Sequence, residues 1–238
     1  MKSLNKVEKE LHDLTDDTIA EHSSRFFKTG MGEYGEGDIF LGIRVPEQRK
    51  IAKKYRDIPL EEVKHLLASA YHEVRLTAIF ILVYKYKKSD TDNKEIIYRF
   101  YMDNLDAVNN WDLVDSSAGY IAGHYLIDKD KSVLYKFAKS DNLWKRRISI
   151  IATSFFISKG FLQDTFQIAE LLLKDQEDLI HKAVGWMLRE TGKKDRTALL
   201  SFLKTHYSVM PRTMLRYSIE KFPDSERKMI LAGDFSIF

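Results

Sequence analysis

Apolar residues recur every three to four positions along almost the whole of this chain, with charged residues between them. This spacing is typical of amphipathic helices that bury one face. Pro46 and Pro59 stand where first helical turns would begin, and short junctions carry Gly, Asp, Asn or Ser. The pattern predicts an all-α fold in one domain, residues 1–238. The expected helices are 4–14, 18–27, 45–57, 58–68, 71–87, 93–104, 110–126, 131–138, 142–158, 163–173, 177–191, 196–205, 211–221 and 224–230.

A second, longer spacing runs through these segments. A period of 35 to 36 residues is the signature of stacked helical repeats, and it predicts a HEAT-like or ARM-like α-solenoid, a superhelix of antiparallel helix pairs. Equivalent positions line up along one face of such a fold. The repeat positions are Arg75, Trp111, Arg147 and Lys182. Asp115 and Trp186 share that face too, because each follows a repeat position by one helical turn.

One glycine-rich segment breaks the helical pattern. Residues 30–42, GMGEYGEGDIFLG, hold five of the 11 glycines, and apolar runs flank them. A glycine-rich turn between such runs predicts a short β-hairpin near residues 26–42 or a mobile loop. The motif Gly30-x-Gly32-x-x-Gly35 imitates a dinucleotide-binding loop. We reject that interpretation, because no helix follows and the nearby carboxylates would repel a phosphate.

Composition excludes several classes of function. The chain has no cysteine, which rules out thiol catalysis, disulfides and thiolate metal sites. No apolar run reaches the roughly 18 residues of a membrane span, and the start, MKSLNKVEKELHD, lacks the apolar core of a secretory signal. HExxH, Walker and G-x-S-x-G motifs are absent. We therefore expect a cytoplasmic monomer without a metal, cofactor or membrane partner, whose seven histidines are surface or partly buried side chains.

Positive charge gathers in one half of the chain. Residues 139–221 hold 15 Lys and Arg against 9 Asp and Glu, a net +6, so with +3 overall the remainder carries −3. Such concentration is typical of a nucleic-acid face, although a solvated lysine-rich surface would show it too. Within this half, the repeat register selects Arg147 as the phosphate contact, and Lys145 and Arg146 beside it are further candidates. Arginine suits phosphate because its planar fork can hold two oxygens.

Trp111 and Asp115 form the first candidate catalytic pair, one helical turn apart in Asn110–Ser116. The alternative is that Trp111 packs in the core and Asp115 forms a surface ion pair. Lys182 and Trp186 form a second same-face pair. Gly185 beside them costs helix stability, so either a ligand or a neighbouring helix must approach the backbone there.

Together these residues suit a cationic reaction centre. Indole faces attract cations, and a carboxylate stabilises an oxocarbenium-like sugar. Arg75, Arg147 and Lys182 would hold flanking phosphates. Such a site could hydrolyse the N-glycosidic bond of a positively charged alkylated base, which leaves without a strong general acid.

At these residues the chain resembles the AlkD-type DNA alkylation repair family, HEAT-like repeat alkylpurine DNA glycosylases. The matching segments are FLGIRVPEQRK (40–50), NWDLVDS (110–116), SDNLWKRR (140–147) and KAVGWMLRE (182–190). The resemblance implies a solenoid whose concave face holds DNA. It also implies that Trp111 and Trp186 contact the lesion-bearing nucleotide, that Asp115 is the catalytic carboxylate and that Arg147 contacts phosphate. The implied substrates are 3-methyladenine and 7-methylguanine lesions.

Residues 30–38 depart from that pattern, because glycosylase members carry a helix there. The glycine-rich stretch is more similar to relatives with a hairpin or loop, which bind branched DNA without detectable glycosylase activity. Three hypotheses remain: a glycosylase acting on duplex DNA, which we favour; a non-catalytic HEAT-repeat protein binding branched or damaged DNA; and a protein-binding scaffold.

Overall fold

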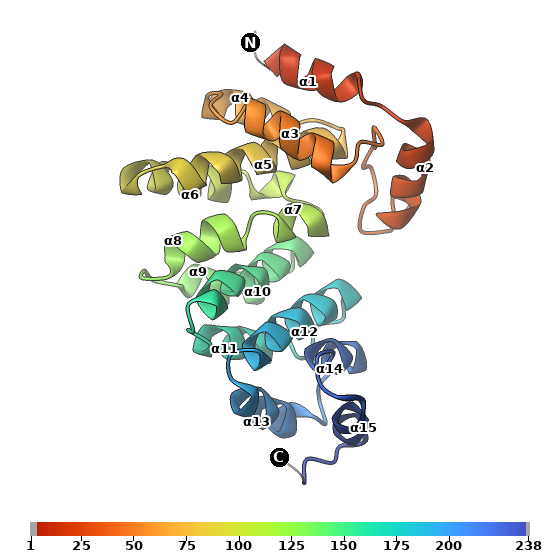
Figure 1. Ribbon diagram of the computed structural model, residues 1–238, viewed down its shortest axis with the longest axis vertical. Coiled ribbons are helices and arrows are strands. Elements are labelled where there is room, and N and C mark those ends of the chain that lie inside the picture. The colour runs from red at the N-terminus through yellow and green to blue at the C-terminus, as the bar shows by residue number, and fades with distance from the viewer. Residues whose placement is uncertain (1–3, 237–238) are drawn as a thin grey trace. The chain divides into compact units, whose positions relative to one another are not determined.

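A computed structural model describes residues 4–236 of the 238-residue chain (Figure 1). Its regular structure is helical, which confirms the all-α prediction. The α-helices are α1 (Leu4–His12), α2 (Asp17–Phe26), α3 (Val45–Lys54), α4 (Leu60–Leu67), α5 (His72–Lys88), α6 (Thr91–Asp103), α7 (Trp111–Asp115), α8 (His124–Leu126), α9 (Ser132–Ala138), α10 (Leu143–Ser158), α11 (Gln163–Leu171), α12 (Asp178–Gly192), α13 (Arg196–His206), α14 (Arg212–Ser218) and α15 (Asp224–Ala232). A 3-10 helix η1 (Leu105–Ala107) and a π-helix η2 (Gly119–Gly123) complete them.

Contacts divide the chain into two compact units, residues 1–121 and 122–238. In the first unit α5 is central, since α1, α3, α4, α6 and α7 all pack against it. Every residue from His72 to Val83 is buried. Buried charges are costly unless they are paired, so the charged side chains of α5 must find partners inside the protein.

In the second unit, helices that are close in sequence pack against one another (Figure 1). Helix α12 packs against α10 and α14, while α11 packs against α9, α10 and α12. Packing of each helix on its near neighbours in sequence is consistent with the predicted α-solenoid. No helix within residues 4–236 is long and apolar enough to cross a membrane.

The glycine-rich segment forms a loop and no hairpin, so of the two expected alternatives the hairpin was wrong. Residues 30–37 are consecutive turns and bends, and within the described residues the β-pairing here is one isolated bridge between Ile39 and Tyr71. The turns fold back on the residues that follow α2: Gly35 N–H donates to Lys28 O at 3.1 Å. A Cβ at Gly35 would lie 2.3 Å from Phe27 O. Close backbone contact therefore replaces strand pairing.

The single helix expected over residues 110–126 was also wrong. Helix α7 ends at Asp115, and π-helical and α-helical turns follow as η2 and α8. The hydroxyl of Ser117 bonds Leu113 O at 2.6 Å, which offers the backbone an alternative partner. The break leaves Trp111 and Asp115 on a short helix of their own.

Candidate functional site

Trp111 and Asp115 are the first and last residues of α7, one turn apart, and both are half-buried. A five-residue helix is too short to be stable by itself. Its geometry must therefore come from contacts outside the helix. These contacts lie at its two ends.

The first anchor of α7 is Asn110, which is completely buried. Its Oδ1 accepts the N–H of Trp111 at 2.8 Å. Its Nδ2 donates to Oδ2 of Asp38 at 2.9 Å. Asp38 ends the glycine-rich turns, so these turns and the helix of Trp111 are joined by one buried amide.

The second anchor is His72 at the start of α5. Its Nδ1 lies 3.1 Å from Asp38 Oδ2 and its Nε2 lies 2.8 Å from Asp112 Oδ2. A neutral imidazole has only one N–H, so donation to both carboxylates requires the imidazolium form. Burial opposes that charge, but the bonds to Asp112 and Asp38 outweigh it and raise the pKa of His72 to about 9. The expectation of surface or partly buried histidines was wrong for His72, which is 1% exposed.

Asp38 is the hub of this cluster, with 6% of its side chain exposed. Burial alone would raise its pKa. The bonds from His72 and Asn110, with the charge of Arg75, lower the pKa of Asp38 instead. Two cations thus balance Asp38 and Asp112 inside the protein.

Arg75 lies in this cluster and is only 6% exposed. Its Nη2 pairs with Asp38, and its Nη1 donates to Ser69 O at 2.9 Å and Ala70 O at 3.2 Å. These contacts give Arg75 a structural role in the protein without DNA.

Glu73 holds the backbone of the FLGI segment, residues 40–43. Its carboxylate accepts the N–H groups of Leu41, Gly42 and Ile43 at 2.9, 2.8 and 3.2 Å. Gly42 has φ +79°, and a Cβ there would lie 2.0 Å from Asp16 O. The segment therefore reaches its place on α5 because of one buried carboxylate and one glycine.

Aromatic rings cover one side of Trp111. Phe27 stacks on the indole with ring centroids 5.1 Å apart and an interplanar angle of 8°. Phe26 meets the same ring edge-on at 5.9 Å and is 59% exposed. Phe40 stacks on His72 at 4.7 Å. The aromatic stack and the charged cluster together hold the indole in one orientation.

The C-terminal end of α7 is anchored separately. The hydroxyls of Tyr101 and Ser117 lie 3.0 Å apart in the core, and Ser117 bonds Leu113 O. Burial raises the pKa of Tyr101 and outweighs the bond to Ser117, so the phenol stays neutral. Helix α7 is thus fixed at both ends.

In the second unit Trp186 is half-buried on α12 and lines a cavity of about 440 Å³. The wall mixes apolar, hydroxyl and charged groups, all from this unit: Ser154, Ile157, Ser158, Trp186, Met187, Glu190, Lys193 and Lys194. One turn before Trp186, Lys182 pairs with Asp178 at 2.7 Å, and its side chain is 41% exposed. Both residues of the predicted pair thus reach the surface.

The three consecutive cations of α10 differ in exposure. Arg146 holds Asp175 through Nε at 2.6 Å and also donates to Ser140 O and Asp141 O. Arg147 is 5% exposed and donates from Nη1 to Leu179 O at 2.6 Å. Lys145 is half-buried. Both arginines thus hold parts of the second unit together.

Gly185 serves a contact between helices. A Cβ there would lie 2.5 Å from Tyr217 Cβ and 2.6 Å from Met214 O, both on α14. Close packing of α12 on α14 therefore accounts for this glycine, without a ligand at the backbone.

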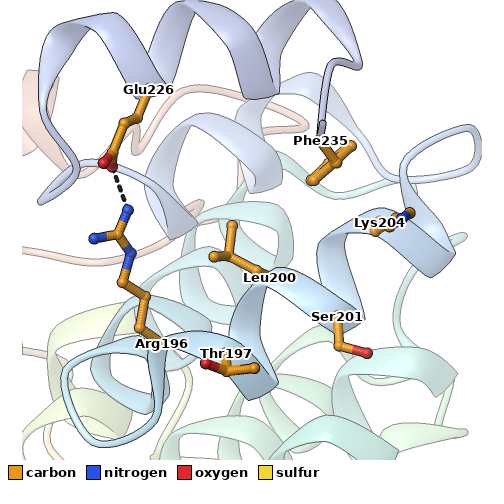
Figure 2. A pocket seen from close by; sticks show the side chains of 7 residues that line it. All are labelled: Arg196, Thr197, Leu200, Ser201, Lys204, Glu226 and Phe235. Carbon is orange, nitrogen blue, oxygen red and sulfur yellow. Dashed lines mark hydrogen bonds and ion pairs between the residues drawn. The ribbon is translucent and has the colours of Figure 1, made fainter. Parts of the chain in front are cut away.

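A larger cavity, about 550 Å³, lies near the C-terminal end of the second unit (Figure 2). Thr197, Leu200, Ser201 and Lys204 of α13 line it with Phe235, and Arg196 pairs with Glu226 across it at 2.5 Å. None of the predicted site residues lines it. Within residues 4–236, no group of three His, Asp or Glu is arranged to hold a metal ion.

The sequence alone does not mark Asp38, His72 and Asn110 as parts of the site. From the sequence, Asp38 is expected only to repel phosphate. One feature of the sequence could have indicated them: a polar residue stands directly before an apolar run. Asp38 precedes IFLGI, and His72 precedes a wholly buried stretch of helix. Nothing in the spacing alone indicates that these positions meet.

A family model described as "DNA alkylation repair enzyme" matches residues 7–222. The chain belongs to this family. A solved structure titled "Predicted DNA alkylation repair enzyme from Enterococcus faecalis" is similar in fold, with a TM-score of 0.68 and 16% sequence identity, over 88% of this chain and 97% of that one. Comparison with curated proteins gives no significant match. Family membership supports a role in DNA repair and an enzymatic one.

Proposed function

We propose that this protein is a DNA glycosylase that hydrolyses the N-glycosidic bond of positively charged alkylated purines, with 3-methyladenine and 7-methylguanine as its substrates. The observation that carries the proposal is the pair on α7. Trp111 and Asp115 share a short helix whose two ends are tied to buried polar groups. Such fixed geometry is what an electrostatic catalyst needs, since its groups must not reorganise during the reaction.

In the proposed reaction the bond between C1′ and the purine nitrogen breaks, and its electron pair leaves with the base. The base thereby loses its positive charge, so no acid need protonate it. The carboxylate of Asp115 stabilises the oxocarbenium-like sugar. It then accepts a proton from the water that attacks C1′. The products are a neutral free base and an abasic deoxyribose.

DNA contacts in this proposal come from two indoles and two half-buried lysines. The indole of Trp111 contributes an aromatic face to the lesion-bearing nucleotide. In the second unit, the half-buried Trp186 gives DNA a further aromatic surface to contact. The half-buried Lys145 and Lys182 are the basic groups that we assign to phosphates. The Lys182–Asp178 pair is a weak surface pair that phosphate can replace. We assign Arg75, Arg146 and Arg147 to holding the helices, because each is engaged inside the protein.

The decisive experiment is release of free base from methylated duplex DNA. Asp115→Asn should lower kcat by about 100-fold or more and largely spare DNA binding. Asp106→Asn is the matched control, because Asp106 is an exposed carboxylate of the same unit. Wild-type turnover by Asp115→Asn would disprove the assigned mechanism, and no release by folded wild-type protein would disprove the glycosylase.

A second candidate is a non-catalytic protein that binds branched or damaged DNA. Two exposed apolar side chains favour it: Met31 in the glycine-rich segment is 94% exposed and Phe26 is 59% exposed. Apolar side chains of this kind can insert where bases are unstacked. Deleting residues 31–37, which spares Asp38, should then abolish any preference for junctions over linear duplex. An unchanged preference would argue against this candidate.

A further inference from the structure

We propose that Asp38 and His72 are positioning residues of the reaction, which together fix the turn of α7 that carries Trp111 and Asp115. The inference rests on the proposed function, because it takes Trp111 and Asp115 as the groups that touch substrate. It adds that the glycine-rich segment, through Asp38, is a working part of the site.

The contacts fall on both sides of Trp111. Asp38 holds Asn110, whose own side chain caps the N–H of Trp111. His72 holds Asp112, whose Oδ1 accepts the N–H of Leu113 at 2.9 Å. The backbone of the first turn is thus tied down before and after the indole. Since catalytic groups must be held within a fraction of an ångström, loss of either tie should slow the reaction more than it weakens binding.

The charges around His72 are balanced on every side. Asp38 and Asp112 face its two ring nitrogens, and Arg75 faces the far oxygen of Asp38. Glu73 beside it turns to the backbone of residues 41–43. When His72 loses its proton, one carboxylate faces a lone pair instead of an N–H. The tie between the glycine-rich segment and α7 then weakens.

This arrangement gives residues 30–38 a role in catalysis. Asp38 N–H donates to Gly35 O at 3.0 Å, Ile39 N–H donates to Ala70 O, and Ile39 O accepts the N–H of His72, the first residue of α5. These bonds fix the carboxylate of Asp38, and Asp38 in turn fixes the side chain of Asn110 in one position. A chain without a helix in this region can still build the proposed catalytic turn.

The test uses the full chain with two readouts, base release and the indole N–H resonance of Trp111. Asp38→Asn and His72→Gln should lower kcat by about 10- to 100-fold while KM changes by less than about 3-fold, and both should shift the Trp111 resonance. The control is Glu36→Gln, which alters an exposed carboxylate of the same segment that accepts the N–H of Gly32. It should match wild type in both readouts. Wild-type kcat and an unmoved resonance in both cluster variants would overturn the proposal.

A pH titration of the wild-type protein keeps the test independent of variant folding and of glycosylase activity. The Trp111 resonance should move between about pH 7 and pH 10, following deprotonation of His72, while that of Trp144 on α10 stays in place. A Trp111 resonance that does not move would overturn the proposal. Movement of the resonance without any base release would support positioning and disprove the proposed reaction, so the two failures are distinct.

Discussion

Asp38 and Asn110, 72 residues apart in the sequence, share a part-buried hydrogen bond of 2.9 Å. One residue ends the glycine-rich turns and the other caps the helix of Trp111. This bond joins the glycine-rich segment to the helix that carries Trp111 and Asp115. The cluster around the bond and the packing of the second unit have measurable consequences.

Stability should fall in alkaline solution. His72 has a pKa of about 9 in the folded protein against an ordinary 6.5. Because the folded pKa is the higher one, its contribution is complete below about pH 6.5 and is lost as the pH rises through 9. The contribution is on the order of 3 kcal/mol. Urea unfolding of wild type at about pH 6.5, 8 and 9.5 should show this decline, and His72→Gln should show a flatter profile. Parallel profiles would contradict the prediction.

Removal of Glu73 should be among the most damaging single changes. Glu73→Ala leaves three buried N–H groups of residues 41–43 without their acceptor. At about 1–3 kcal/mol for each unsatisfied group, we expect a loss of at least about 3 kcal/mol in the free energy of unfolding. Glu61→Ala, which removes an exposed carboxylate from α4, should cost less than about 1 kcal/mol. Equal losses in denaturant unfolding would show that Glu73 anchors nothing.

Gly185→Ala should destabilise the contact of α12 with α14. The new methyl group would meet the backbone of Met214, which cannot move aside as a side chain can. We expect a loss of about 1–3 kcal/mol despite the better helix propensity of alanine. Gly192→Ala is the control, because its methyl group meets the flexible end of Leu199. A thermal unfolding midpoint that is unchanged in Gly185→Ala would rule out the packing account.

Neighbouring cations of α10 should separate binding from stability. Arg146→Ala leaves the side chain of Asp175 buried without its cation and should cost about 3–5 kcal/mol in unfolding. Lys145→Ala should leave unfolding nearly unchanged, weaken DNA binding for all sequences and reduce the salt slope by about 1. Lys174→Ala serves as the exposed control on the same unit. The assignment fails if Lys145→Ala binds DNA with wild-type affinity and wild-type salt dependence.

Outside residues 110–126, the sequence by itself determined the helices and their order. Apolar periodicity, prolines at first turns and short polar junctions are local properties, and the helices α3, α5, α10 and α12 lie within a few residues of their predicted bounds. The repeat spacing alone also singled out Trp111, Asp115, Lys182 and Trp186 as candidates, because equivalent positions of repeats share a face.

Only the tertiary structure decided which basic residues are available to bind phosphate. Nothing in the sequence distinguishes Arg75, Arg146 and Arg147 from phosphate-binding arginines. In the structure each one bonds protein groups that lie 5 to 37 positions away in the sequence. Likewise, the broken helix after Asp115 and the folded loop at residues 30–38 involve Ser117 and Asp38, whose partners Tyr101 and Asn110 lie 16 and 72 positions away in the sequence. A buried charge must be paired, and its partner can come from any part of the chain that the fold brings close to it. The periodicity of apolar residues therefore does not predict which residues pair.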